Sequence, residues 1–428
     1  MSDTTERPFG FWMAAALVVG GMIGSGIFVL PGQLAPFGWT GMVAWLFCAG
    51  GAMLIAVVLA RLAAAMPQAS GVVAVCAGIL GPLPGLLIGW AYWVGVWSAN
   101  AIISLTAVRY LGTFFPVLNN DPLVTALAAV ALIWLLTALN LRGAKTAGRF
   151  QVVTTALKLL PLVAVVLILI GFVATGGAQF RSVPHAAFAW GQLTPAIGLA
   201  FFALVGFEGA SIAAERVRNP ARNVLRATLA GLALTALLYV IVCSGIVFAM
   251  PEAVINASPA PVALFVSTFW GPAAGLAIAA FAVIAAVGCL NGWVLMQGEV
   301  PLGMSRAGVL PRWVGATNKR DVPVGALVAS SLLSSTLVLS SASRSTGVLL
   351  DFMLQLTTAA TLWIYMGACL AALKAGIARP AAVLGLAFAA WALWGTGAEA
   401  AGLSVALMLT AIPLYLLRPK TALAEQPA

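Results

Sequence analysis

The sequence predicts an all-α polytopic membrane protein with about 12 transmembrane helices. Of its 428 residues, 62% are hydrophobic and 7% are charged, and the mean hydropathy is +1.07. A typical soluble domain has about 25% charged residues, so the composition excludes an ordinary soluble enzyme or binding domain. The apolar residues form runs of about 20, long enough to cross a bilayer as helices, instead of the alternating segments of a transmembrane barrel.

The helices are expected where these apolar runs occur, with short loops between them. The third run is longer than a bilayer requires, which indicates a tilted helix. Residues 1–10 and 418–428 are expected to form short tails. We expect spans at 11–31, 40–64, 83–115, 122–141, 152–173, 193–213, 225–249, 272–297, 323–341, 348–372, 380–396 and 400–417.

The positions of the Lys and Arg residues predict the orientation. With the N-terminus inside, Arg109, Arg181 and Arg344 fall on the outer side and Lys158 lies within a span, whereas all the other Lys and Arg residues fall on the inner side. Cytoplasmic loops carry such an excess of positive residues. We therefore expect both termini in the cytoplasm and a location in the bacterial inner (plasma) membrane, in contact with lipid.

The motifs exclude several classes of function. The five cysteines are scattered singly and His185 stands alone, so we expect no metal site and no cofactor. Phosphate-binding loops, His-Glu-x-x-His and Gly-x-Ser-x-Gly are missing, which argues against an enzyme, and no ring of filter residues indicates a channel. The net charge of +10 does not indicate nucleic acid, because the charges lie in short loops between spans.

The first span contains an unusual run of glycines, Gly20-Gly21-Met22-Ile23-Gly24-Ser25-Gly26. Close helix packing explains pairs of small residues such as Gly20 and Gly24. A longer run followed by Pro31 predicts a helix that is interrupted near the membrane midplane. Opened backbone at that depth must line a cavity or be buried in protein, and secondary transporters bind their substrates at such breaks.

The sixth span contains a second candidate break, with Glu208 between Gly206 and Gly209. Interrupted helices five spans apart predict two inverted five-helix repeats, 11–173 and 193–372, with the last two spans, 380–417, outside them. A carboxylate within a span is costly and is by default functional. A structural ion pair or a protonated, hydrogen-bonded acid is the alternative for Glu208.

These residues carry a resemblance to a known family. The matching stretches are Gly24–Phe28 with Leu30-Pro31, Tyr92-Trp93, Trp97–Asn100, Val205–Glu208 with Ala210-Ser211, Asn219–Val224 and Gly292-Trp293. At these positions the chain resembles the amino acid–polyamine–organocation superfamily, and within it the basic amino acid/polyamine antiporter family, especially the branch that exchanges arginine for agmatine.

The resemblance implies a set of substrate-binding residues. The substrate carboxylate would bind backbone N–H groups at Ser25 and Gly26, where the helix dipole favours an anion, and the α-amine would bind carbonyls freed around Ile23 and Val205. Trp293 would stack on a guanidinium or amine. Asn100 would bind the far end of the substrate's side chain, and Thr357 would line the pocket wall. Phe202 would also contact the substrate, at the position where the family has tryptophan.

The resemblance also implies residues that link transport to protons or to gating. Glu208 would be the proton-linked acid, and Tyr92 and Tyr365 would be gating aromatics. Lys158 lies about 10 Å inside the fifth span, where its stem could reach the interface. Proton-coupled members of the superfamily carry a lysine at the matching position, so a proton-linked role for Lys158 is the alternative.

Two functional hypotheses follow. The first is exchange of a cationic amino acid, such as arginine, for its amine product or another amino acid, motivated by Trp293, Asn100 and Glu208. The second is proton-coupled symport of neutral amino acids, motivated by Lys158 and Phe202. A channel or a polytopic membrane enzyme would be a function of another class. The expected partners are a small amino acid or amine, protons and lipid but no nucleic acid, and the resemblance allows a homodimer.

Overall fold

The structure is a computed structural model, and it describes residues 10–66, 71–142, 157–208, 211, 217–319, 322–340 and 346–417. Most of the predicted N-terminal tail, the C-terminal tail 418–428, Gly209, Ala210 and Arg344 lie outside the described residues. Within those ranges the regular structure is entirely helical, which confirms the predicted fold class.

The helices follow the predicted order. The long apolar ones are α3 (Gly38–Ala65), α5 (Pro82–Leu111), α7 (Pro122–Asn140), α9 (Leu159–Ala174), α13 (Pro220–Ala249), α16 (Pro272–Arg306), α17 (Val324–Ser340), α18 (Thr346–Ala375), α19 (Arg379–Gly395) and α20 (Gly397–Leu409). The first and sixth spans are divided into α1 (Phe11–Met22) with α2 (Ser25–Leu34), and α11 (Trp190–Phe201) with the 3₁₀ helix η2 (Phe202–Leu204). Short helices connect them: η1 (Ala35–Phe37), α4 (Val72–Leu80), α6 (Val117–Asn120), α10 (Ala178–Ser182), α14 (Glu252–Asn256), α15 (Pro261–Trp270) and α21 (Ile412–Leu416).

The lengths and hydropathies of these helices fit a multi-pass membrane protein. Seven apolar stretches are long enough to cross a membrane, and five further apolar helices are 10–17 residues long. Several predicted boundaries differ. The third span ends at Leu111 and not at 115, and the eighth continues to Arg306 and not to 297. The predicted end of the sixth span at 213 lies outside the described residues.

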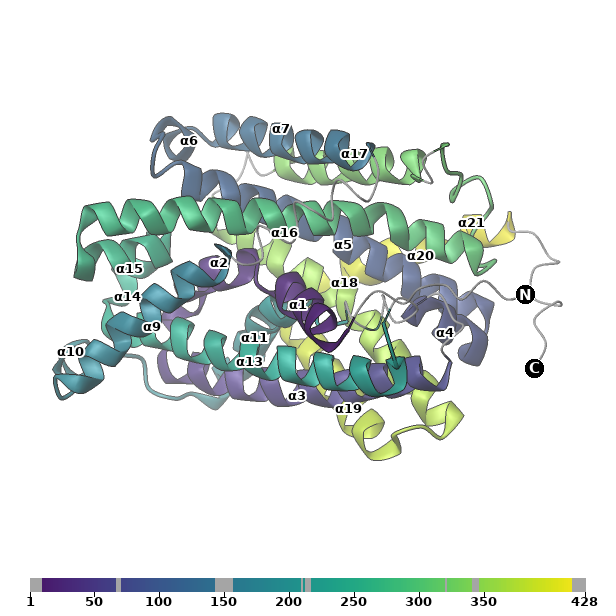
Figure 1. The fold of residues 1–428 in the computed structure, drawn as a ribbon, viewed down its shortest axis with the longest axis horizontal. Coiled ribbons are helices and arrows are strands. Elements are labelled where there is room, and N and C mark those ends of the chain that lie inside the picture. Colours follow the sequence, from purple (N-terminus) through teal and green to yellow (C-terminus); the bar gives the residue numbers. More distant parts are fainter. Residues whose placement is uncertain are drawn as a thin grey trace.

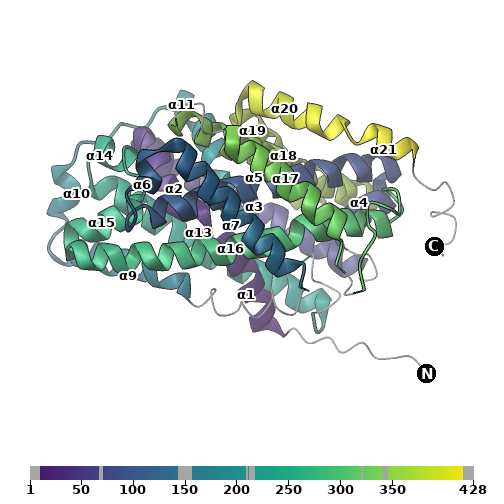
Figure 2. The same ribbon diagram turned by 90° about the horizontal axis from the view of Figure 1, so that it is seen from above.

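Helix α5 forms the centre of the bundle. Every residue from Ala91 to Val108 is buried, as expected for a helix that is apolar on all sides, and α5 packs mainly on α16 and α18. The short helices α6, α10, α14 and α15 gather at one end of the molecule, and α4 and α21 lie at the other (Figures 1 and 2). The breaks in the two interrupted helices, at Ile23-Gly24 and Val205-Gly206, are buried.

Candidate functional site

The first span is broken where the glycine run predicts it. Helix α1 ends at Met22, Ile23 is extended (φ −71°, ψ 96°), and α2 begins at Ser25 after Gly24 (φ −148°, ψ −134°). The N-cap residue of α2 is a glycine, which has no side chain to cap the helix. The break therefore separates the C-terminal carbonyl groups of α1 from the N-terminal N–H groups of α2, which have no partners within a helix.

The sixth span is broken in the same way. Helix α11 gives way to η2, Val205 is extended (φ −61°, ψ 137°), and Gly206 has φ +111°. Only glycine adopts this left-handed conformation without steric strain. The second predicted break is therefore present at Val205-Gly206, and its expected continuation through Gly209 lies outside the described residues.

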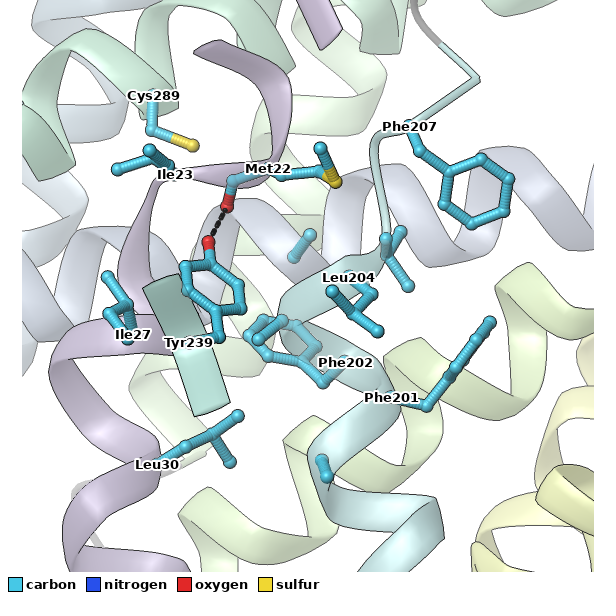
Figure 3. Packing of buried hydrophobic residues seen from close by; sticks show 14 of the residues in the cluster. Met22, Ile23, Ile27, Leu30, Phe201, Phe202, Leu204, Phe207, Tyr239 and Cys289 are labelled. Carbon is cyan, nitrogen blue, oxygen red and sulfur yellow. Dashed lines mark hydrogen bonds between the residues drawn. The ribbon is translucent and has the colours of Figure 1, made fainter. Parts of the chain in front are cut away.

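The two breaks touch each other, and their glycines make this contact possible. A Cβ added to Gly21 would lie 3.0 Å from the carbonyl oxygen of Gly206, and one added to Gly26 would lie 2.7 Å from Cα of Ala203. A Cβ at Gly24 would collide with the thiol of Cys289 on α16. The glycine run thus serves both the helix break and close packing of the two interrupted helices (Figure 3).

A small cavity of about 20 Å³ lies between the two breaks. Six of the predicted substrate-binding residues line it: Ser25, Gly26, Phe202, Val205, Trp293 and Thr357. The other residues in its wall are Gly21, Met22, Gly24, Ala99, Ile103, Ala203 and Cys289. A cavity of this volume holds about one water molecule, whereas ligand sites measure about 300–1,000 Å³. The structure therefore represents a closed site, whose walls must separate to admit a ligand.

Two donors satisfy carbonyl groups at the end of α1. Tyr239 on α13 donates its hydroxyl to the carbonyl oxygen of Met22 at 2.7 Å (Figure 3). Lys158 is 1% exposed, and its ammonium donates to the carbonyl oxygen of Gly20 at 2.8 Å. The lysine head group therefore points into the protein and not to the surface. A cation is favourable there because carbonyl groups give a helix C-terminus partial negative charge.

Glu208 is buried in a ring of donors. Its Oε1 accepts from the hydroxyl of Tyr92 at 2.8 Å, and its Oε2 accepts from the hydroxyl of Tyr365 at 2.7 Å and from the N–H of Gly206 at 3.0 Å. The ring of Tyr365 also stacks on Phe207, with centroids 4.9 Å apart. Three predicted proton-linked or gating residues thus form one cluster, which ties α5 and α18 to the second break.

Two predicted site residues do not line the cavity. Asn100 is fully buried and donates to Oε1 of Gln297 at 2.7 Å, and Gln297 in turn donates to the hydroxyl of Ser331 at 2.7 Å. Asn100 therefore belongs to a polar network between α5, α16 and α17. Ile23 is 1% exposed and lies in the break itself, as Figure 3 shows.

The site can hold opposite charges at opposite ends. The start of α2 offers N–H groups at the positive end of a helix dipole, which favour an anion. The end of α1 offers carbonyl groups, already occupied in part by the donors from Lys158 and Tyr239. Trp293 adds an aromatic face, which attracts cations. These features together suit a zwitterion that carries an additional positive charge.

Comparison with known proteins identifies the family. The profile described as "Amino acid permease" matches residues 9–421. The chain is 31% identical over 353 residues to a cadaverine/lysine antiporter of Escherichia coli (strain K12), a match that covers 80% of this chain and 77% of the antiporter. The protein belongs to the amino acid permease family. This permease is also similar to a putative arginine/ornithine antiporter of Bacillus subtilis (strain 168), with 30% identity over 83% of this chain and 81% of the relative.

A putrescine transporter of Escherichia coli (strain K12) is 26% identical over 94% of the permease and 93% of the relative. These relatives confirm the predicted placement among basic amino acid/polyamine antiporters. The permease is accordingly a multi-pass membrane protein that takes part in amino acid exchange, and its relatives are transporters of small amino acids or amines. They do not favour the symport of neutral amino acids.

Three residues described above were not predicted from the sequence. Cys289 lines the cavity; it precedes Trp293 by four positions, and this helical spacing places both on one face. Tyr239 on α13 and Gln297 on α16 donate to groups on other helices, and no local pattern indicates such contacts.

Proposed function

We propose that this permease exchanges a cationic amino acid, such as lysine or arginine, for its decarboxylated amine across the bacterial inner membrane. The observation that carries the proposal is the cavity between the two breaks, where the start of α2 and the face of Trp293 line one small volume. The first is suited to a carboxylate and the second to an ammonium or guanidinium group.

Antiporters among the relatives are named for lysine with cadaverine and for arginine with ornithine. Lysine and arginine share an α-carboxylate, an α-amine and a distal cation. Their decarboxylated amines keep the distal cation but lose the carboxylate. They would therefore keep the contact with Trp293 and lose the contact with Ser25 and Gly26. This difference makes the amino acid the tighter ligand, and the amine the readily released product.

Glu208 is the group that we propose links exchange to protons. As a carboxylate it accepts three hydrogen bonds, from Tyr92, Tyr365 and Gly206. Protonation would turn one carboxylate oxygen from an acceptor into a donor. All three partners donate to the carboxylate, so the hydroxyl of Tyr92 or Tyr365 would have to turn and accept the new proton. Because the same carboxyl group accepts from Gly206 in the second break, a change in this cluster could be passed to the cavity wall.

We propose a second proton-linked role for Lys158. Its contact with the carbonyl oxygen of Gly20 weakens if the ammonium becomes a neutral amine. The excess of positive residues on one side supports cytoplasmic termini, and the resemblance supports inverted repeats at 11–173 and 193–372. A homodimer and contacts with anionic lipid belong to the same set of proposals.

Reconstituted vesicles test the exchange. Labelled lysine or arginine would be added to proteoliposomes that are empty or loaded with cadaverine or agmatine. We expect uptake only into loaded vesicles. Uptake into empty vesicles driven by a pH gradient would show symport and overturn the proposal, and failure to take up either amino acid under any loading would overturn its cationic substrate.

A matched pair of tryptophan variants tests the site. Trp293→Leu removes a cation–π contact of about 2 kcal/mol, which corresponds to about 30-fold in affinity for a cationic substrate. Trp270→Leu changes a tryptophan that is 50% exposed at the end of α15 and should leave transport unchanged. Equal effects of the two substitutions would contradict a stacking role for Trp293.

A further inference from the structure

Helices α6, α14 and α15 gather at one end of the molecule (Figure 2). A second and larger cavity lies beside them, lined by residues of all three. Its volume is about 450 Å³, within the range of ligand sites. We call it the vestibule. Its wall includes Val29 of α2, Arg109 of α5, Asn256 of α14, and Asp351 and Met353 of α18.

The vestibule and the cavity between the breaks share three helices. On α2, Val29 follows Ser25 by four residues, or about 6 Å of helix rise. On α18, Met353 precedes Thr357 by the same interval. On α5, Leu105 lines the vestibule and Ile103 lines the inner cavity. The vestibule therefore lies about one helical turn beyond the closed site, on the side to which α2 leads.

Two opposite charges line the vestibule without binding each other. No ion pair within 4.0 Å joins Arg109 to Asp351 in the part of the chain that the structure describes. The Oδ1 atom of Asp351 is buried and has no hydrogen-bond partner there. Partly buried charges are costly when they are unpaired. A structural ion pair would remove this cost, so the separation of the two groups indicates that each meets a ligand.

We propose that the vestibule is a second binding site for the amino acid substrate, in which Arg109 binds the α-carboxylate and Asp351 binds an ammonium group. Arginine suits a carboxylate because its planar guanidinium can donate two parallel hydrogen bonds. The inference rests on the exchange function proposed above. It adds selectivity for the amino acid over the amine on one side of the membrane. An amino acid engages both charges, whereas a diamine, which lacks the carboxylate, engages only Asp351.

Under the predicted orientation α2 leads outward, so the vestibule receives substrate from outside. It would then favour entry of the amino acid over return of the released amine. The inner cavity keeps its own contacts, so the vestibule affects the apparent affinity on one face and not the rate of the transport step.

The test measures KM for lysine and for cadaverine separately in right-side-out and inside-out membrane vesicles loaded with the counter-substrate. We expect Arg109→Gln to raise the KM for lysine about tenfold in right-side-out vesicles, as expected for the loss of a hydrogen bond to a charged group, with no change for cadaverine. Asp351→Asn should raise the KM for both. Arg181→Gln, the same substitution at an exposed arginine on α10 outside the vestibule wall, should raise neither.

Each contrary outcome has a distinct meaning. Absence of exchange by the unchanged protein would overturn the proposed function itself. Exchange with an unchanged KM on both faces in both charge variants would overturn only the vestibule site, and so would an equal effect of Arg109→Gln on lysine and cadaverine. Loss of folded protein in the single variants, with recovery in Arg109→Asp/Asp351→Arg, would show a structural ion pair and overturn the inference.

Discussion

The contact between the two broken helices makes a sharp prediction for Gly26→Ala. The added Cβ would lie 2.7 Å from both Cα and Cβ of Ala203, whereas carbon atoms pack best at about 3.5–4.0 Å. Because Cα of Ala203 belongs to the backbone, rotation of a side chain cannot relieve the clash. The start of α2 and the second break must therefore separate by about 1 Å.

The cost can be stated in stability and in transport. Overpacking of this kind costs about 1–3 kcal/mol of stability. A shift of about 1 Å at a site that depends on positioning costs about 100-fold in rate, by analogy with enzymes. We therefore expect folded protein whose lysine–cadaverine exchange in proteoliposomes is reduced by about that factor.

A glycine with open space provides the control. Gly50 on α3 has no atoms within 4 Å of its added Cβ, so Gly50→Ala should exchange like the unchanged protein. Thermal unfolding in detergent would separate loss of fold from loss of transport. Gly26→Ala with the exchange rate and thermal stability of the unchanged protein would refute the view that this close contact shapes the site.

Three further predictions concern the polar groups around the breaks. Glu208→Gln cannot titrate, so the part of the pH dependence of exchange that Glu208 carries should disappear; a pH profile identical to that of the unchanged protein would assign proton linkage elsewhere. Lys158→Met removes the donor to Gly20 and should alter the pH profile independently of Glu208→Gln. Additive changes in the double variant would support two proton-linked groups. A pH profile that Lys158→Met leaves unaltered would mean that Lys158 has only a packing role. Tyr239→Phe leaves the carbonyl of Met22 without its donor and should lower the free energy of unfolding by about 1–3 kcal/mol. A variant that unfolds at the same temperature as the unchanged protein would contradict this prediction.

The sequence was sufficient for the fold class because the membrane imposes simple rules. Backbone N–H and C=O groups in hydrocarbon must be hydrogen-bonded within their own segment. The length of an apolar run alone therefore predicts helices such as α7 and α13. The boundaries were less accurate at Arg306. The apolar run predicted that the eighth helix ends at 297, but α16 continues to Arg306, and Pro301 inside it does not end the helix.

The breaks were predictable because glycine content is a local signal. Gly24 and Gly206 mark positions where helix geometry ends. The contacts across them were not predictable, since the distance between Gly21 and Gly206 depends on how two spans pack. The same reason explains Asn100. Its residue type indicated a polar role, but only the packing of α5 on α16 directs it toward Gln297 and not into the cavity.

The central claim is that substrate binds between the two breaks, and the thiol of Cys289 in that wall can report it directly. In a variant whose other four cysteines are replaced by alanine, the measurement is the rate at which a small thiol reagent modifies Cys289 during opening of the site. We predict that lysine and cadaverine slow the modification at the concentrations that saturate exchange, and that glutamate does not. A modification rate that saturating lysine leaves unchanged would contradict the account.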